Sequence, residues 1–163
     1  GFVVCIDTNR EFECCGLYID GMDYQELCQH EGLEKKWRTE LAMQGRDYAI
    51  AIRGAHIMQK LGLVDVDVRM NDKVEFVTLQ SADYEERKHD FIEYNEWTSS
   101  IGEDGKEKMI LHLLTHGMSR KEAEDYCCRN DKIAEYFSGN PAAGYTALKG
   151  QLISYGRKAD TSA

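Results

Sequence analysis

Asp7 is the side chain whose position most clearly indicates a binding site. It follows the apolar run at residues 2–6, which has the continuous hydrophobic character of a central strand in a parallel sheet. In open α/β sheets, ligands bind at the carboxyl ends of such strands. An aspartate there can equally cap the turn after the strand, so both roles stay open. Arg69, near the end of a second expected strand, is interpreted as a structural ion-pair partner of Asp72.

Two further pairs of residues could do chemistry by type. His112 and His116 stand four residues apart, as two metal ligands on a helix would, but Leu113 occupies the position where a zinc protease carries its glutamate. We therefore interpret both as surface or packing histidines and expect no metal. Cys127 and Cys128 could form a redox pair, yet Cys127 falls on the apolar stripe of an expected helix, which favours a core role.

The composition indicates one globular domain spanning residues 1–163. Hydrophobic residues make up 42% and charged residues 30%, enough for a conventional core. The net charge of -9 argues against nucleic acid and anionic membranes as partners. No apolar run in the sequence could span a bilayer and no basic leader precedes residues 2–6, which predicts a cytoplasmic protein. Because the six cysteines include no CxxC pair, we expect reduced thiols, mostly in the interior.

The elements that must position these residues alternate between strands and helices. Ser119 and Glu122 have the spacing of a capping box, which predicts a helix start there. Gly45 and Gly62 have the positions of helix ends. In chain order, hydrophobic spacing predicts a strand at 2–6, an irregular segment at 8–20, helices at 23–30, 34–43 and 50–61, strands at 64–69 and 73–79, helices throughout 81–137, and a strand at 148–155.

Several strings, in this order, resemble the C-terminal portion of bacterial class I S-adenosylmethionine-dependent methyltransferases. The run FVVCID after Gly1 is similar to the fifth strand of that fold, which follows a Pro-Gly-Gly turn. The string KLGLVDVDVRMNDKVEF at residues 60–76 is similar to the family's next helix, its sixth strand and the segment beyond. Residues 107–126 resemble the helical insertion of one bacterial subgroup, and LISYG at residues 152–156 resembles the seventh strand.

The resemblance implies an α/β fold: the C-terminal part of a class I methyltransferase (Rossmann-like) sheet. About three strands are expected, with a large helical insertion or cap at residues 81–140 between the last two. The final strand would lie antiparallel between the other two. The resemblance also implies a small-molecule methyl acceptor. Since the family's Gly-rich loop has no counterpart in this sequence, we expect S-adenosylmethionine to be the cofactor of the parent enzyme, with no cofactor-binding residues in this chain and no activity of the isolated chain.

The same resemblance places Trp37, Asp47 and Tyr48 at a wall of the substrate pocket. Asp7 and Arg69 join them as candidate substrate-binding residues. A core tryptophan and a helix-capping aspartate are the alternatives for Trp37 and Asp47. The catalytic base is left unassigned, because His56, His89 and Asp47 are all permitted by type.

An alternative function is a non-enzymatic module whose helices at residues 81–137 serve dimerisation or partner binding. Association is expected under either function. A sheet fragment that exposes the apolar edge and face of its first strand invites pairing with another copy, so we expect a homo-oligomer, a dimer or larger.

Overall fold

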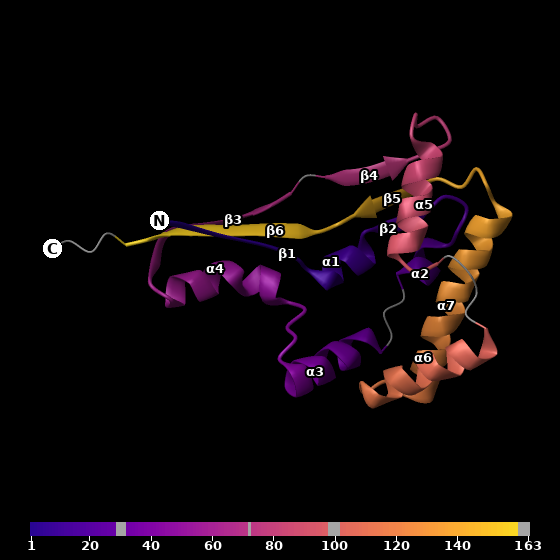
Figure 1. Ribbon diagram of the computed structural model, residues 1–163, viewed down its shortest axis with the longest axis horizontal. Coiled ribbons are helices and arrows are strands. Elements are labelled where there is room, and N and C mark those ends of the chain that lie inside the picture. The colour runs from indigo at the N-terminus through magenta and orange to yellow at the C-terminus, as the bar shows by residue number, and fades with distance from the viewer. Residues whose placement is uncertain (29–31, 72, 98–101, 160–163) are drawn as a thin grey trace. The chain divides into compact units, whose positions relative to one another are not determined.

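The structure, a computed structural model, describes residues 1–28, 32–71, 73–97 and 102–159 (Figure 1). The chain forms two compact units, each described here by itself. The first unit comprises Gly1–Gly16, Asp47–Val74 and Leu148–Ala163, and the second comprises Leu17–Arg46 and Glu75–Ala147. The helical insertion expected at 81–140 lies in the second unit, which residues 17–46 also help to build. Within the described ranges, no helix is both long and apolar enough to cross a membrane.

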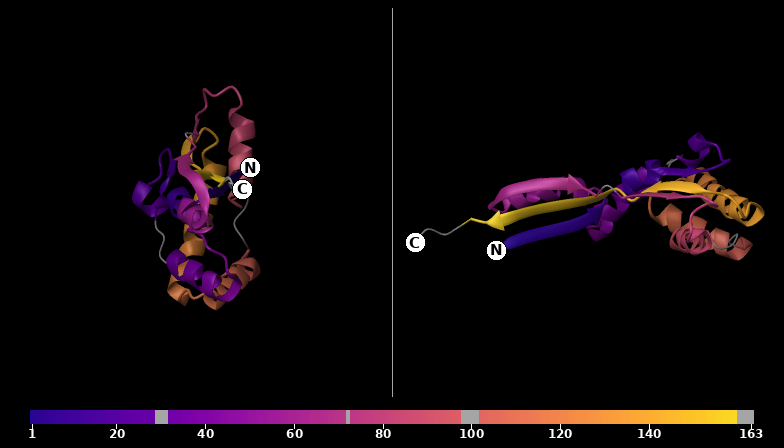
Figure 2. Two further views of the ribbon diagram at one scale, coloured as in Figure 1. Left: turned by 90° about the vertical axis from the view of Figure 1, so that its left-hand side faces the viewer. Right: turned by 90° about the horizontal axis from the view of Figure 1, so that it is seen from above.

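The sheet of the first unit contains β1 (Phe2–Thr8), β6 (Gln151–Lys158) and β3 (Leu63–Met70), in the order β1-β6-β3. Strand β6 pairs antiparallel with both neighbours, so that β1 and β3 run parallel to each other on either side of it (Figure 2). Ser154 of β6, for example, lies opposite Cys5 on one side and Val68 on the other. The last strand therefore takes the middle position that was expected for it.

Helix α4 (Ile50–Lys60) packs against one face of this sheet and begins on the side where β1 ends (Figure 1). Residues of β6 alternate between buried and half-buried, as the period of two predicts, with Leu152 and Ser154 buried. Gly54 permits the close approach, because a Cβ at that position would lie 2.9 Å from Ser154 Oγ. Gly62 follows the helix with a φ of +81°, which confirms it as the predicted stop.

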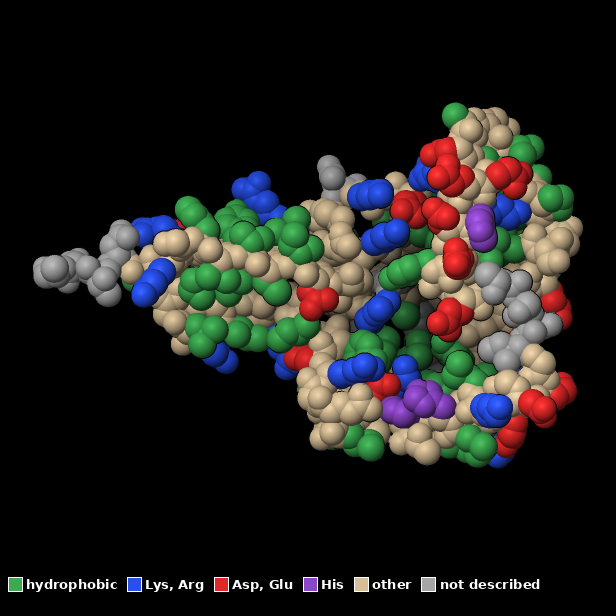
Figure 3. Space-filling view, viewed as in Figure 1, with side chains coloured by type: hydrophobic (Ala, Val, Ile, Leu, Met, Phe, Trp, Pro, Cys, Tyr) green, Lys and Arg blue, Asp and Glu red, His purple; other side chains and the backbone are tan. Residues whose placement is uncertain are grey.

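Strand β1 is an edge strand, and the prediction of a central strand is wrong for these residues. Its apolar side chains are largely exposed, and hydrophobic side chains gather over this sheet in Figure 3. Phe2 is 79% exposed, Val4 58% and Ile6 62%. A continuous apolar run is typical of a strand that is covered on both faces. The run does not determine the position of the strand within its sheet, and here the middle position belongs to β6.

The second unit has a small sheet of β2 (Leu17–Ile19), β5 (Tyr145–Leu148) and β4 (Val74–Val77), in the order β2-β5-β4. Strand β2 pairs antiparallel with β5. The sequence predicted β4, but it missed β2 and β5, as well as α1 (Arg10–Cys15) of the first unit in a segment expected to be irregular. Strand β2, with three residues, is too short to display a period of two.

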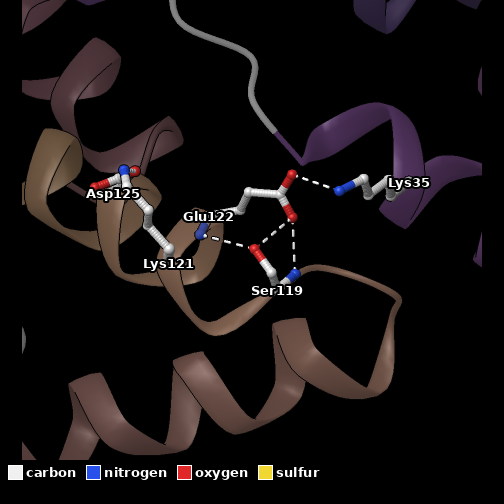
Figure 4. A network of polar contacts seen from close by, with 5 residues as sticks. All are labelled: Lys35, Ser119, Lys121, Glu122 and Asp125. Atoms are coloured by element: carbon white, nitrogen blue, oxygen red, sulfur yellow. Dashed lines mark hydrogen bonds and ion pairs between the residues drawn. The ribbon is translucent and has the colours of Figure 1, made fainter.

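The helices of the second unit are α2 (Tyr24–Leu27), α3 (Leu33–Gln44), α5 (Tyr84–Tyr94), α6 (Glu103–Thr115) and α7 (Arg120–Gly139). The predicted capping box at the start of α7 is confirmed: Glu122 N donates to Ser119 Oγ at 3.3 Å, and Ser119 N donates to Glu122 Oε2 at 2.8 Å. Lys35 of α3 adds an ion pair of 2.6 Å to the same carboxylate (Figure 4). Together these contacts hold the pKa of Glu122 at about 2.

Aromatic rings fill the core of the second unit. Phe91 stacks on Tyr145 with ring centroids 3.8 Å apart, and it meets Trp97 and Phe137 edge-on. Burial raises the pKa of Tyr145 to about 12. Lys88 is buried beside this cluster, where its ammonium group donates to the carbonyl oxygen of Pro141 at 2.8 Å, and desolvation lowers its pKa.

None of the six cysteines, all within the described ranges, forms a disulfide, but the expectation that most lie in the interior is wrong. Cys127 is buried, as its place on the helical stripe predicted, and burial raises the pKa of its thiol. Cys14 and Cys28 are half-buried, whereas Cys5, Cys15 and Cys128 are exposed. The exposed thiols follow from their elements: Cys5 lies on the uncovered edge strand, and Cys128 is the residue after the core position of α7.

Candidate functional site

The carboxyl ends of the two parallel strands, β1 and β3, lie at the same end of the first sheet, on either side of the beginning of β6. Thr8 at the end of β1 lies opposite Gln151. On the other side, the backbone N–H of Asn71, which follows β3, donates to Gln151 O at 2.9 Å. Asn9 is buried, and its N–H donates to Gly150 O at 3.3 Å. We refer to Asp7, Thr8, Asn9, Asn71 and Gln151 as the polar end of the first sheet.

Asn71 carries the feature of this polar end that most clearly indicates a ligand. Its amide nitrogen donates to Gln151 Oε1 at 2.9 Å. Its oxygen Oδ1 is buried, with no hydrogen-bond partner among the described residues. Since buried acceptors in folded proteins are nearly always paired, an N–H or O–H donor from outside these residues would complete the site.

Asp7 projects at the same end of the sheet and is exposed. Its Oδ1 accepts a hydrogen bond from Thr8 N at 2.8 Å, which is the contact expected of an aspartate that caps the turn. A carboxylate has two oxygen atoms and several acceptor positions, so this contact is compatible with ligand binding. The capping contact thus leaves acceptor positions of Asp7 available for a ligand.

Arg69 lies near the end of β3 opposite Ile153, on the face of the sheet away from α4. Its Nε is 3.8 Å from Asp67 Oδ2, and the Tyr155 hydroxyl donates to the same carboxylate oxygen at 2.7 Å. The hydrogen bond from Tyr155 is the main cause that lowers the pKa of Asp67, and a contact with Tyr155 also raises the pKa of Arg69. The expected partner Asp72 lies outside the described residues, so Asp67 is the ion-pair partner that the structure gives.

Asp47 and Tyr48 precede α4. Asp47 Oδ1 accepts from Ala49 N at 3.0 Å, and the carboxylate forms an ion pair with Arg53 in the first turn of the helix. Tyr48 is half-buried beside it. Four of the five sequence-derived candidates thus belong to the first unit, and Asp7, Arg69 and the start of α4 lie toward one end of it. Trp37 is half-buried on α3 of the second unit.

A second group of titratable side chains lies within the second unit. Glu40 is buried, with Oε1 3.3 Å from Lys36 Nζ and 3.9 Å from His116 Nε2. His116 is also buried, and its Nδ1 lies 2.8 Å from the carbonyl oxygen of His112. Desolvation and the neighbouring His116 lower the pKa of His112. This packing between α3 and α6 agrees with surface or packing histidines.

The other residue types considered for catalysis lie apart from these groups. His56 is exposed on α4 of the first unit, and His89 is exposed on α5 of the second. In the described part of the chain, no three His, Cys, Asp or Glu side chains gather as metal ligands would.

Sequence reasoning missed Asn71, Gln151 and Asn9 as members of the polar end. The signal for Asn71 was its place directly after the alternating valines of the strand expected at 64–69. Gln151 could not be found in this way, because its role depends on the placement of β6 between β1 and β3.

Comparison of the chain with protein-family models and with curated protein sequences gave no match. What the chain does must therefore be inferred from its own residues.

Proposed function

We propose that this chain is the distal part of a class I S-adenosylmethionine-dependent methyltransferase that acts on a small molecule. The observation that supports this most strongly is the strand order β1-β6-β3, with β6 antiparallel between two parallel strands. Helix α4 directly precedes β3 and contacts all three strands, so it covers one face of this sheet as the helix of a βαβ crossover does. An antiparallel strand between the outer strands of a βαβ unit is the arrangement that the resemblance implies.

The residues of this chain do not fit a cofactor site of that class. Such a site needs a glycine-rich turn directly after a parallel strand, so that backbone N–H groups can approach the ligand. In the described sequence, β1 is followed by Asn9 and β3 by Asn71. Neither turn contains a glycine, and we assign no step that passes through the cofactor to these residues.

The polar end of the first sheet is the place proposed for the methyl acceptor. Methyl transfer requires that the acceptor atom be aligned, which a protein achieves by fixed hydrogen bonds. Asn71 Oδ1 would accept a hydrogen bond from a hydroxyl, amine or amide of the substrate. Asp7 at the end of β1 would accept a second one. A substrate with hydrogen-bond donors therefore suits this site.

Calorimetric titration with S-adenosylmethionine tests the proposal. The product of the complete reading frame that encodes this chain should bind the cofactor and methylate a small molecule. The isolated 163-residue chain should give no binding heat. Micromolar binding by the isolated chain would show that the cofactor site lies within it, and absence of binding by the complete product would exclude a methyltransferase.

Self-association is a second proposal, and a separate observation favours it. Within the part of the chain that the structure describes, β1 pairs with β6 along one edge and with no strand along the other. The apolar side chains of β1 are exposed. An exposed apolar edge strand is a template for pairing with a second chain. The proposed partner is another copy of this chain, whose β1 would extend the sheet.

A further inference from the structure

The free edge of strand β1 carries a regular pattern of backbone groups. On its other edge, β1 pairs with β6 at every residue from Phe2 to Thr8. The free edge lies on the side of β1 away from β6 and β3, and no strand of the described ranges pairs with it (Figure 2). In a strand, the N–H and C=O groups of one residue point to one side, and those of the next residue point to the opposite side. The backbone groups of β1 are therefore divided between β6 and the free edge.

Two hydrogen bonds at the ends of this pairing show which residues of β1 face β6. Lys158 N donates to Gly1 O at 3.0 Å, and Asn9 N donates to Gly150 O at 3.3 Å. Since the register between them is unbroken, the odd-numbered residues of β1 direct their N–H and C=O groups toward β6. The residues that direct these groups toward the free edge are the even-numbered ones, Phe2, Val4, Ile6 and Thr8.

One of the groups on the free edge is already bonded. Thr8 N donates to Asp7 Oδ1 at 2.8 Å, a contact at the very end of the strand. The groups of Val4 and Ile6, at the centre of the edge, have no such contact among the described residues. A second strand with N–H and C=O groups at the same spacing would complement them.

An antiparallel copy of β1 has this spacing. Two antiparallel strands exchange backbone hydrogen bonds only where residues that point toward each other lie opposite, so even-numbered residues must face even-numbered residues. The register that pairs the whole strand places Phe2 opposite the partner's Thr8 and Val4 opposite the partner's Ile6. Cys5, the middle residue of β1, then lies opposite the partner's Cys5 on a twofold axis perpendicular to the sheet.

We propose that two copies of this chain pair through β1 in this antiparallel register, with the twofold axis at Cys5. This inference rests on the proposed self-association and specifies its geometry. Val4 exchanges both backbone hydrogen bonds with the partner's Ile6. The side chains of Val4 and Ile6, 58% and 62% exposed in a single copy, contact each other across the new pair of strands. Asp7 lies opposite the partner's Val3, so no like charges meet.

Cys5 distinguishes this register from its alternatives. Because the backbone groups of Cys5 point toward β6, its pair with the partner's Cys5 is of the non-hydrogen-bonded type, in which opposite Cα atoms are about 4.5 Å apart. A disulfide needs Cα atoms roughly 4.4–6.8 Å apart, so the two exposed thiols can be joined. In the next allowed registers, centred on Val4 or on Ile6, the two Cys5 residues become diagonal neighbours about 7–8 Å apart, which is too far for a disulfide.

Oxidation of the 163-residue chain with oxidised glutathione tests the proposal. One Cys5 thiolate attacks a sulfur of oxidised glutathione and releases one molecule of reduced glutathione. The partner's Cys5 thiolate then attacks the Cys5 sulfur of this mixed disulfide, which joins the two chains and releases the second reduced glutathione. Peptide mapping without reductant should identify a link between the two Cys5 residues. It should form about tenfold faster than links through Cys15 or Cys128, the other exposed thiols, because only the Cys5 pair is held together in the dimer.

Two variants with a shifted cysteine are the matched controls. The first combines Cys5→Ser with Val4→Cys, and the second combines Cys5→Ser with Ile6→Cys. In the proposed register, the two introduced thiols of each variant are diagonal neighbours rather than opposite residues. Their cross-linking should therefore be about tenfold slower than that of Cys5 in the parent.

The outcomes separate the register from self-association itself. A parent chain that is dimeric by light scattering but forms no link between its Cys5 residues would overturn the register and leave self-association standing. Faster cross-linking of either shifted variant would do the same, since it would place the twofold axis at Val4 or at Ile6. A parent chain that is monomeric at high concentration would overturn both proposals. Peptide mapping of the parent needs no substitution, so it decides the question even if a variant does not fold.

Discussion

Ser154 Oγ lies 2.9 Å from the point that a Cβ on Gly54 would occupy, so α4 and β6 cross with no room for a side chain between them. Ser154 is buried at this crossing, and Ala51 and Met58 bury the adjoining parts of the helix. The first unit thus depends on a close contact between one glycine and one small polar residue.

Gly54→Val should destabilise the first unit. Two methyl groups placed against Ser154 overpack the crossing, which costs about 1–3 kcal/mol of unfolding free energy. Gln59→Val, at an exposed position of the same helix, introduces the same side chain without a clash and should stay close to the parent. Urea unfolding followed by circular dichroism measures both, and equal stabilities of the two variants would contradict the crossing described.

Glu122 should make the stability of the second unit depend on pH. Its pKa is held at about 2, below the ordinary 4.5, by Lys35 and by the Ser119 N–H and hydroxyl. The contribution of these contacts to the unfolding free energy is present above pH 4.5 and is lost as the pH falls toward 2. It is lost because the Glu122 carboxylate of the unfolded chain takes up a proton at a higher pH than that of the folded chain. The unfolding free energies of the parent and Glu122→Gln should therefore differ at about pH 6 and converge at low pH. Glu135→Gln, an exposed position on α7, should follow the parent throughout.

Asn71 should matter for methyl transfer more than for folding. In the product of the complete reading frame, Asn71→Leu removes the acceptor oxygen proposed for the substrate and should reduce kcat/KM about tenfold. Asn71→Asp keeps an oxygen at this position and should retain more activity. Gln59→Leu, on the exposed side of α4, is the control. If Asn71→Leu and Gln59→Leu have equal kcat/KM, the acceptor does not bind at this end of the sheet.

Val4→Lys should convert the proposed dimer into a monomer. A lysine on an exposed edge strand opposes pairing with a second strand, because its charge would be desolvated. Light scattering should give half the parent's mass. Leu61→Lys changes an equally apolar exposed residue after α4 and should leave the mass unchanged. A parent chain that is monomeric at high concentration would rule out self-association through β1.

Cys128 should react with iodoacetamide long before Cys127, although the two are adjacent in the chain. Cys127 is buried and its pKa is raised by desolvation, so less of it is thiolate. Peptide mapping after a short pulse distinguishes the two sites. In urea, Cys127 and Cys128 should label at similar rates. Similar labelling rates of the two cysteines without urea would show that α7 does not bury Cys127.

The sequence predicted the long elements well. The stripe of α7, its capping box at Ser119 and the stop of α4 at Gly62 are local features, and each was confirmed. Strands β2 and β5 were missed, because their pairing joins residues more than a hundred positions apart. The position of β1 at an edge was missed for the same reason, since neighbours in a sheet are not encoded in the strand itself.

The candidate site was predictable only in part. Asp7 was found because a carboxylate at a strand end has a recognisable position in the sequence. Asn71 and Gln151 meet only when β6 is inserted beside β3, a tertiary event without a local signal. Within the second unit, residues of 22–27 and of 121–132 line a common pocket, and their proximity likewise has no local signal in the sequence.

The pairing of Phe2 with Arg157 has a consequence for biosynthesis. At roughly 5–20 residues per second, a ribosome takes on the order of ten seconds or more to supply β6 after β1 has emerged. During that interval β1 lacks the strand with which it pairs in its own unit, since in the described sheet both β1 and β3 pair with β6. The second unit is complete once Ala147 has been made. It can therefore fold first, while β1 waits for β6 before it can pair within its own sheet.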